Sequence, residues 1–238
     1  MSNPLLRDSV FHSPASHNGV MTVSGTINKS VILWIFLAAS AFYSWTHPAV
    51  IMPLLFPILM GAFVLAVVSV FKKTASPFLS PLYALCEGLV LGAVSLYFEK
   101  MYQGIVVNAI LSTICVLFCM LASYKAGMLK ATPRFQKTVI FSTLAIGLVY
   151  MADLLLNVFG VGKFPYIHDS STLGIVVSFA IAAVASLNLI IDFDLIEKGA
   201  QSGSPKYMEW YGALSLMITL VWLYLEMLKL LSKLSNRD

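Results

Sequence analysis

Two acidic residues interrupt the end of a long apolar run, in the stretch LNLIIDFDLIEK at residues 187–198. The run begins near Thr172, and Asp192 and Asp194 stand where hydrocarbon is expected to give way to water. An ionised carboxylate at membrane depth is costly unless it is paired, hydrated or protonated. The two acids are therefore candidates for chemistry that responds to protons or cations.

Three more acids fall within apolar runs: Glu87, Asp153 and Glu226. Within the expected spans only Lys229 is basic, so salt bridges alone are not expected to neutralise these carboxylates. They can stay protonated through desolvation, share protons as pairs, or face a wet cavity that admits a cation. Each outcome predicts a pH-dependent structure, and the last two predict a cation pathway.

Purely structural interpretations stand beside the functional ones. Asp194 and Glu197 are expected near the membrane interface, where solvation alone is enough for a charged side chain. Glu226 has Lys229 three residues later, so the pair could reach the interface together. Glu87 is expected near the membrane midplane, with room left by Gly88 beside it.

The composition indicates that these acids lie in a membrane protein. The chain has 238 residues, of which 59% are hydrophobic and 11% charged, whereas soluble domains carry about 25% charged residues. This is the composition of an integral membrane protein in contact with the lipid bilayer, with length for one bundle of helices. The basic residues are spread over loops, which argues against nucleic-acid binding.

Hydropathy predicts an all-α membrane protein with seven spans and three regions. Residues 1–28 are expected to form a disordered cytoplasmic tail, 29–232 a seven-span membrane domain, and 233–238 a short C-terminal tail. Pro53 and Pro57 predict a kinked or partly unwound start of the second span. Gly88 and Gly92 predict close helix packing of the third. The expected spans are 30–45, 49–71, 78–98, 104–123, 138–160, 172–194 and 207–231.

The distribution of Lys and Arg predicts a cytoplasmic N-terminus. In that orientation the inner segments carry Arg7, Lys29, Lys72, Lys73, Lys125, Lys130, Arg134, Lys137, Lys198 and Lys206, and the outer loops carry Lys100 and Lys163. A basic C-terminal tail would lie outside after seven spans, against the rule. We favour seven spans over the alternative, a re-entrant last segment.

The known enzyme classes of membranes find no support. The chain has no HExxH metalloprotease motif and no GxSxG nucleophile elbow. Asp153 and Asp192 could supply the two acids of an intramembrane aspartyl protease, but the usual sequence contexts are missing. We expect no enzymatic activity and no cofactor beyond transient Ca²⁺, and the sequence leaves the metal ligands open.

At LIIDFDLIEKGAQSGSPKYMEWYGAL the chain resembles the transmembrane Bax inhibitor motif (Bax inhibitor-1-like) family, in particular its bacterial branch. The segment CEGLVLG at residues 86–92 supports the resemblance. The resemblance implies six helices around a central seventh, and a pH-sensitive calcium leak governed by two aspartates. Asp192 matches the first, but the second falls at about Met217, which is apolar. Asp194, Asp153 or Glu87 could replace it.

Two functional hypotheses follow. In the first, the chain is a pH-sensitive cation leak for Ca²⁺ or H⁺ in a bacterial inner membrane, gated by Asp192 with Glu87, Asp153, Asp194 or Glu226. In the second, it is a non-conducting modulator that binds other membrane proteins, such as a protease or a secretion complex. Acids that converge on one cavity would favour the first hypothesis, and acids scattered to interfaces would favour the second.

Overall fold

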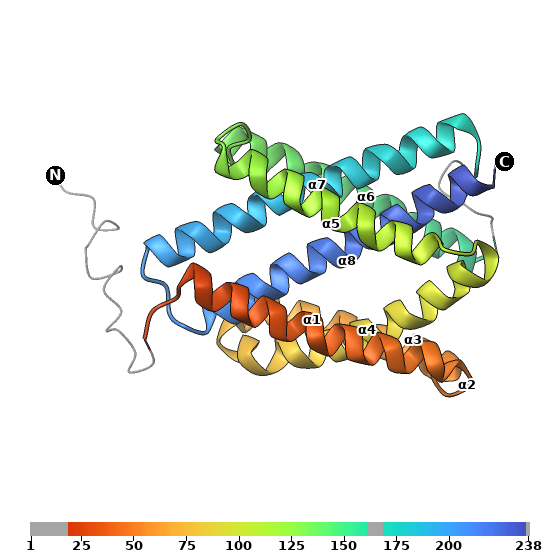
Figure 1. The fold of residues 1–238 in the computed structure, drawn as a ribbon, viewed down its shortest axis with the longest axis horizontal. Helices are drawn as coiled ribbons and strands as arrows, with labels where there is room; N and C mark the ends of the chain where they lie inside the picture. Colours follow the sequence, from red (N-terminus) through yellow and green to blue (C-terminus); the bar gives the residue numbers. More distant parts are fainter. Residues whose placement is uncertain (1–18, 161–168, 237–238) are drawn as a thin grey trace.

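The computed structural model describes residues 19–160 and 169–236, and it is an all-α bundle (Figure 1). Within these ranges seven helical segments are long and apolar enough to cross a membrane, as predicted. The long helices are α1 (Val23–Thr46), α3 (Leu55–Phe71), α4 (Ser76–Met101), α5 (Ile105–Lys125), α6 (Pro133–Val158), α7 (Thr172–Gln201) and α8 (Met208–Ser235).

The second span begins with a break in the helix, as its prolines predict. The short helix α2 (Pro48–Ile51) is followed by a 3₁₀ turn, η3 (Met52–Leu54), before α3 begins. Proline lacks the N–H that an α-helix needs, so Pro53 and Pro57 favour a tightened turn at this point. A second 3₁₀ turn, η4 (Lys73–Ala75), joins α3 to α4.

Small residues bring α1 and α4 into close contact. A Cβ at Gly88 would overlap the Ser40 hydroxyl and the Leu37 carbonyl, and one at Gly92 would overlap the Ala41 carbonyl. The two glycines lie one turn apart on the same face of α4, so only hydrogen atoms separate the two backbones there. The predicted small-residue contact is confirmed, and its partner is the first span.

The last helix, α8, is a full span at the centre of the bundle. Figure 1 shows α8 (blue) crossing the middle of the molecule, and it packs against α1, α4, α5 and α7. Its 28 residues run without a break from Met208 to Ser235. The start of α1 and the end of α8 lie at opposite ends of the bundle (Figure 1), and a re-entrant last segment does not agree with the structure. We call these the N-terminal end and the C-terminal end.

Several helices extend beyond the predicted apolar runs. The helix α1 begins at Val23, where the Thr22 hydroxyl accepts a hydrogen bond from the Gly25 N–H, so residues 23–28 are helical rather than part of a tail. The rest of the predicted tail, residues 1–18, lies outside the described residues. The helix α7 continues seven residues past Asp194 to Gln201. The helix α8 includes Lys233, which the sequence assigned to the C-terminal tail.

Candidate functional site: buried carboxylates along α7 and α8

Asp192 lies on α7 at its interface with α8. Its side chain is 5% exposed, and its Oδ1 accepts a hydrogen bond of 2.6 Å from the Ser215 hydroxyl of α8. The Thr219 hydroxyl, one turn further along α8, also interacts with this carboxylate. The second oxygen, Oδ2, is buried and has no hydrogen-bond partner among the described residues.

The partner of Asp192 differs from the sequence-based expectation. The sequence leaves Asp194, Asp153 or Glu87 as the second acid, but the group hydrogen-bonded to Asp192 is the uncharged hydroxyl of Ser215. Met217, at the position where the resemblance implies an acid, is fully buried and packs in an apolar cluster with Leu33 and Leu37 of α1. Asp192 is therefore a single buried carboxylate held by hydroxyl groups, and not one half of an aspartate pair.

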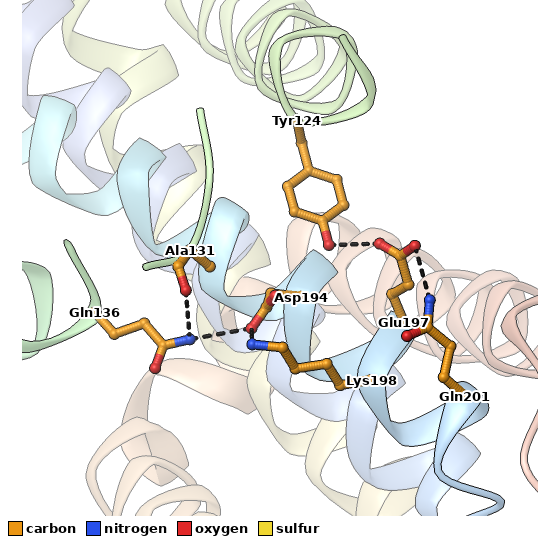
Figure 2. Close-up of polar contacts among 7 residues, drawn as sticks. All are labelled: Tyr124, Ala131, Gln136, Asp194, Glu197, Lys198 and Gln201. Carbon is orange, nitrogen blue, oxygen red and sulfur yellow. Dashed lines mark hydrogen bonds and ion pairs between the residues drawn. The ribbon is translucent and has the colours of Figure 1, made fainter. Parts of the chain in front are cut away.

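Asp194 lies two residues further along α7, in a different polar group (Figure 2). Its Oδ2 accepts hydrogen bonds from Lys198 Nζ at 2.6 Å and from Gln136 Nε2 at 3.0 Å. Gln136 also donates to the carbonyl of Ala131, just before α6, so its side chain ties the start of α6 to Asp194 of α7. Hydropathy predicts that the sixth span ends at Asp194, but α7 continues to Gln201 and supplies Lys198 as the counter-charge of Asp194.

Glu197 completes the polar group at this end of α7. The Tyr124 hydroxyl of α5 donates to Glu197 Oε2 at 2.5 Å, and Gln201 donates to Oε1. In Figure 2 the Tyr124 ring points from α5 toward Glu197, while Lys198 points toward Asp194. These contacts link α5, α6 and α7 at the N-terminal end of the bundle.

Glu226 lies toward the opposite end of α8 and is paired. It is 1% exposed, and its Oε1 accepts hydrogen bonds from the Tyr150 hydroxyl of α6 at 2.8 Å and from Lys229 Nζ at 3.1 Å. The Lys229 ammonium also lies 4.4 Å from the centre of the Tyr150 ring. The pairing of Glu226 with Lys229 is the structural alternative that their spacing suggested. Its other oxygen, Oε2, is buried and without a hydrogen-bond partner among the described residues.

The remaining two acids lie in still other surroundings. Glu87 is buried on α4, where the Tyr83 hydroxyl one turn earlier interacts with its carboxylate. Asp153 is half-buried on α6, and its charge acts on Tyr150. The five candidate residues are thus divided among separate groups, and Asp192 and Glu87 are the two buried ones without an ion pair among the described residues.

Sequence reasoning did not single out Glu209, the acid nearest the N-terminal end of α8. It is 2% exposed, and its Oε1 accepts hydrogen bonds of 3.1 Å from both the N–H and the hydroxyl of Thr22. Residues 20–22 form an N-terminal clasp with the α7–α8 loop: the Met21 N–H donates to the Ser204 carbonyl at 2.7 Å. The sequence signal was present in Gly25, whose missing side chain leaves the space that the Glu209 carboxylate fills.

A cavity of about 700 Å³ lies between α1, α5 and α7 at the N-terminal end. Its floor is apolar and includes Leu121 and Phe193, and its rim carries Tyr124, Asp194 and Glu197. We call it the α5–α7 cavity. A second cavity, of about 730 Å³ and almost entirely apolar, lies between α1, α4, α5 and α8. Within the described residues, no group of three or more His, Cys, Asp or Glu is placed to hold a metal ion.

A comparison with protein families decides the relationship that the sequence suggested. The family model described as Bax inhibitor 1 like matches residues 3–236, nearly the whole chain. The chain belongs to the Bax inhibitor 1 like family. No curated protein matches the chain, and no solved structure does. This family member is a multi-pass membrane protein in which Asp192 of α7 is buried against two hydroxyl groups of the central helix α8.

Proposed function

We propose that this Bax inhibitor 1 like protein is a pH-sensitive leak for cations, with Asp192 as its gate. The observation that carries the proposal is the Asp192 carboxylate, which is buried at the interface of two spans and, among the described residues, is hydrogen-bonded only to hydroxyl groups. A buried carboxylate without a counter-charge is stabilised by a proton or by a cation. Protons and Ca²⁺ would then compete for the same oxygens.

Because the partner of Asp192 is the Ser215 hydroxyl, we expect the Asp192 carboxylate to titrate as a single group. Two carboxylates that share a site release their protons in two coupled steps. Asp192 faces Ser215 and Thr219, so its hydroxyl partners do not titrate and one proton sets its charge. We therefore expect the leak to follow pH with the slope of a single ionisation.

Flux measurements in liposomes test the gate. The purified chain is reconstituted, and Ca²⁺ entry is recorded from about pH 6 to pH 8 for the wild type, Asp192→Asn and Glu87→Gln. We expect Asp192→Asn to remove the pH response, and Glu87→Gln to lower the flux at every pH. Glu197→Gln is the matched control, because Glu197 is an exposed carboxylate on the same helix. An unaltered flux and pH profile in Asp192→Asn would show that the gate lies elsewhere.

One observation favours the alternative, a non-conducting modulator of other membrane proteins. The five candidate acids are divided among separate groups, and Asp194 and Glu226 have salt-bridge partners. Chemical crosslinking in membranes followed by purification distinguishes the two functions. A chain that conducts robustly when purified alone contradicts the modulator, whereas a silent chain crosslinked to one stoichiometric partner contradicts the leak.

We also propose that the N-terminal end faces the cytoplasm of a bacterial cell. Among the described residues that end carries most of the basic side chains of the loops, including Lys72, Lys125, Lys130 and Lys206. Labelling with a membrane-impermeant maleimide tests this orientation in a background in which the cysteines Cys86, Cys115 and Cys119 are alanine. Ser235→Cys should react in intact cells, and Ser202→Cys should react only after the membrane is opened.

A further inference from the structure

The floor of the α5–α7 cavity suits hydrocarbon. Its α5 wall consists of Leu117, Phe118 and Leu121, and its α7 wall includes Phe193 and Ile196. Water gains few hydrogen bonds against such a surface, whereas an alkyl chain is stabilised when its apolar area is removed from water. The cavity therefore favours an apolar group over water.

The cavity opens sideways toward the lipid. Ile27 of α1 and Phe118 of α5 both line it, and their side chains are 57% and 63% exposed. Exposed apolar side chains on membrane spans contact acyl chains, because water is absent there. An acyl chain of the surrounding bilayer can therefore enter between α1 and α5 without crossing a polar barrier.

The rim of the cavity carries two lysines that have no partner in the part of the chain that the structure describes. Lys125 ends α5 and Lys130 lies in the following loop; both are exposed, and both line the cavity. Within residues 19–160 and 169–236 neither ammonium forms a hydrogen bond or an ion pair. The rim therefore has two positive charges available to a ligand.

The carboxylates of the same rim are already engaged. Asp194 is bonded to Lys198 and Gln136, and Glu197 to Tyr124 and Gln201 (Figure 2). Lys198 offsets the charge of Asp194, and the Tyr124 hydroxyl covers one oxygen of Glu197. The remaining attraction at the mouth is for an anion.

We propose that the α5–α7 cavity binds an anionic phospholipid from the adjacent leaflet. The phosphate lies between Lys125 and Lys130, and one acyl chain runs along Phe118 and Leu121. Basic side chains at a membrane surface attract anionic headgroups, and the apolar floor selects a ligand that carries a chain. Free phosphate would use the lysines but not the floor, and a neutral lipid would use the floor but not the lysines.

Native mass spectrometry of the purified full chain tests the site. The protein is released from detergent with phosphatidylglycerol, phosphatidylcholine of equal chain length, or inorganic phosphate, and the bound fraction is measured. We expect the wild type to retain phosphatidylglycerol about 25-fold more than phosphatidylcholine, since each of the two lysines near the headgroup contributes about fivefold. Lys125→Gln with Lys130→Gln should lower the bound fraction of phosphatidylglycerol to that of phosphatidylcholine. Lys125→Arg with Lys130→Arg keeps both positive charges and should bind phosphatidylglycerol as the wild type does.

Lys137→Gln is the matched control, because Lys137 is an exposed lysine near the start of α6 that does not line this cavity. It should leave retention unchanged, and a loss equal to that of the double variant would reduce the effect to general surface charge. Equal retention of both lipids by the wild type would contradict a contact between the lysines and the headgroup. Complete displacement of phosphatidylglycerol by millimolar inorganic phosphate would show that the lysines bind free phosphate, and would contradict the proposed lipid site.

Discussion

The Ser215 hydroxyl lies 2.6 Å from Asp192 Oδ1, at the interface between α7 and the central helix α8. The two residues are 23 positions apart in the chain, on opposite sides of the loop that joins these helices. The bond fixes the one buried carboxylate of α7 against the centre of the bundle. It also gives Asp192 an uncharged hydroxyl as its partner instead of a second acid.

Ser215→Ala should destabilise the bundle by about 1.5–3 kcal/mol, the usual value for a hydrogen bond to a charged group. The substitution removes the donor and leaves the buried Asp192 oxygen with one hydroxyl fewer. Unfolding in mixed detergent micelles measures the change. Ser232→Ala on the same helix is the control, because the Ser232 hydroxyl donates only to the Lys229 carbonyl. Equal losses in the two variants would contradict a special role for Ser215.

The contact between α1 and α4 should not tolerate a methyl group at Gly88. A Cβ there meets the Leu37 carbonyl, which is backbone and cannot turn aside. We expect Gly88→Ala to cost about 1–3 kcal/mol through overpacking. Gly147→Ala on α6 is the control, because a Cβ at Gly147 meets nothing within 4 Å. Thermal unfolding in detergent compares the two variants, and Gly88→Ala should have the lower melting temperature. Similar melting temperatures would show that α1 and α4 separate readily.

Removal of Lys229 alone should lower the free energy of unfolding more than removal of both Lys229 and the charge of Glu226. Lys229→Met leaves the buried Glu226 without its counter-charge, and breaking a buried ion pair in this way costs about 3–5 kcal/mol. Because Lys229 is partly exposed, we expect a value at or below the lower end of that range. Lys229→Met combined with Glu226→Gln should recover much of the loss. A double variant less stable than Lys229→Met alone would show that the carboxylate has another partner.

Asp169 should give the start of α7 a small sensitivity to acid. Its Oδ1 accepts a hydrogen bond from the Ser171 N–H at 3.0 Å, and bonds from Ser171 hold the pKa of this exposed carboxyl below its usual 3.8. A carboxyl with a lowered folded-state pKa stabilises the fold above its unfolded pKa, and loses this effect as pH falls through the folded value. Melting temperatures from pH 6 to pH 3 should therefore fall slightly more in the wild type than in Asp169→Asn, mainly below about pH 4. The same dependence of melting temperature on pH in the wild type and in Asp169→Asn would contradict a contribution of the Asp169 carboxylate to stability.

Gly25→Ala should open the N-terminal clasp. A Cβ at this position overlaps the Glu209 carboxylate, which must then leave the Thr22 N–H and hydroxyl. The free energy of unfolding should fall by about 1–3 kcal/mol, the cost of leaving a buried polar group without its hydrogen bonds. Gly61→Ala on α3 is the control, since a Cβ there meets nothing within 4 Å. Proteolysis near residue 20 should accelerate in Gly25→Ala alone, and equal cleavage of the two variants would contradict the clasp.

Hydropathy was sufficient for the number of spans because the thickness of the bilayer sets the length of an apolar helix. It located the ends less well, since helical hydrogen bonding continues into water after the apolar residues stop. Residues 195–201 of α7 show this difference, and they include Lys198, the partner of Asp194. Pro53 was informative because its ring restricts the backbone, and Gly88 because its missing side chain lets another helix approach closely.

The polar contacts were harder to anticipate from the chain. A serine in an apolar helix carries no charge, so nothing marked Ser215 as the group that would face Asp192. Glu209 was overlooked because its partner, Thr22, is 187 residues away. Charge and hydropathy indicate which residues are costly to bury, whereas the packing of helices decides which neighbours they meet.

The N-terminal clasp also orders events during synthesis. Thr22 leaves the ribosome before any of the seven spans, yet the carboxylate that receives it belongs to α8. The first helix must therefore wait in the bilayer with an open start until the final helix is inserted. A chain cut short before α8 lacks this closure altogether, and its exposed leading end would distinguish an unfinished molecule from a complete one.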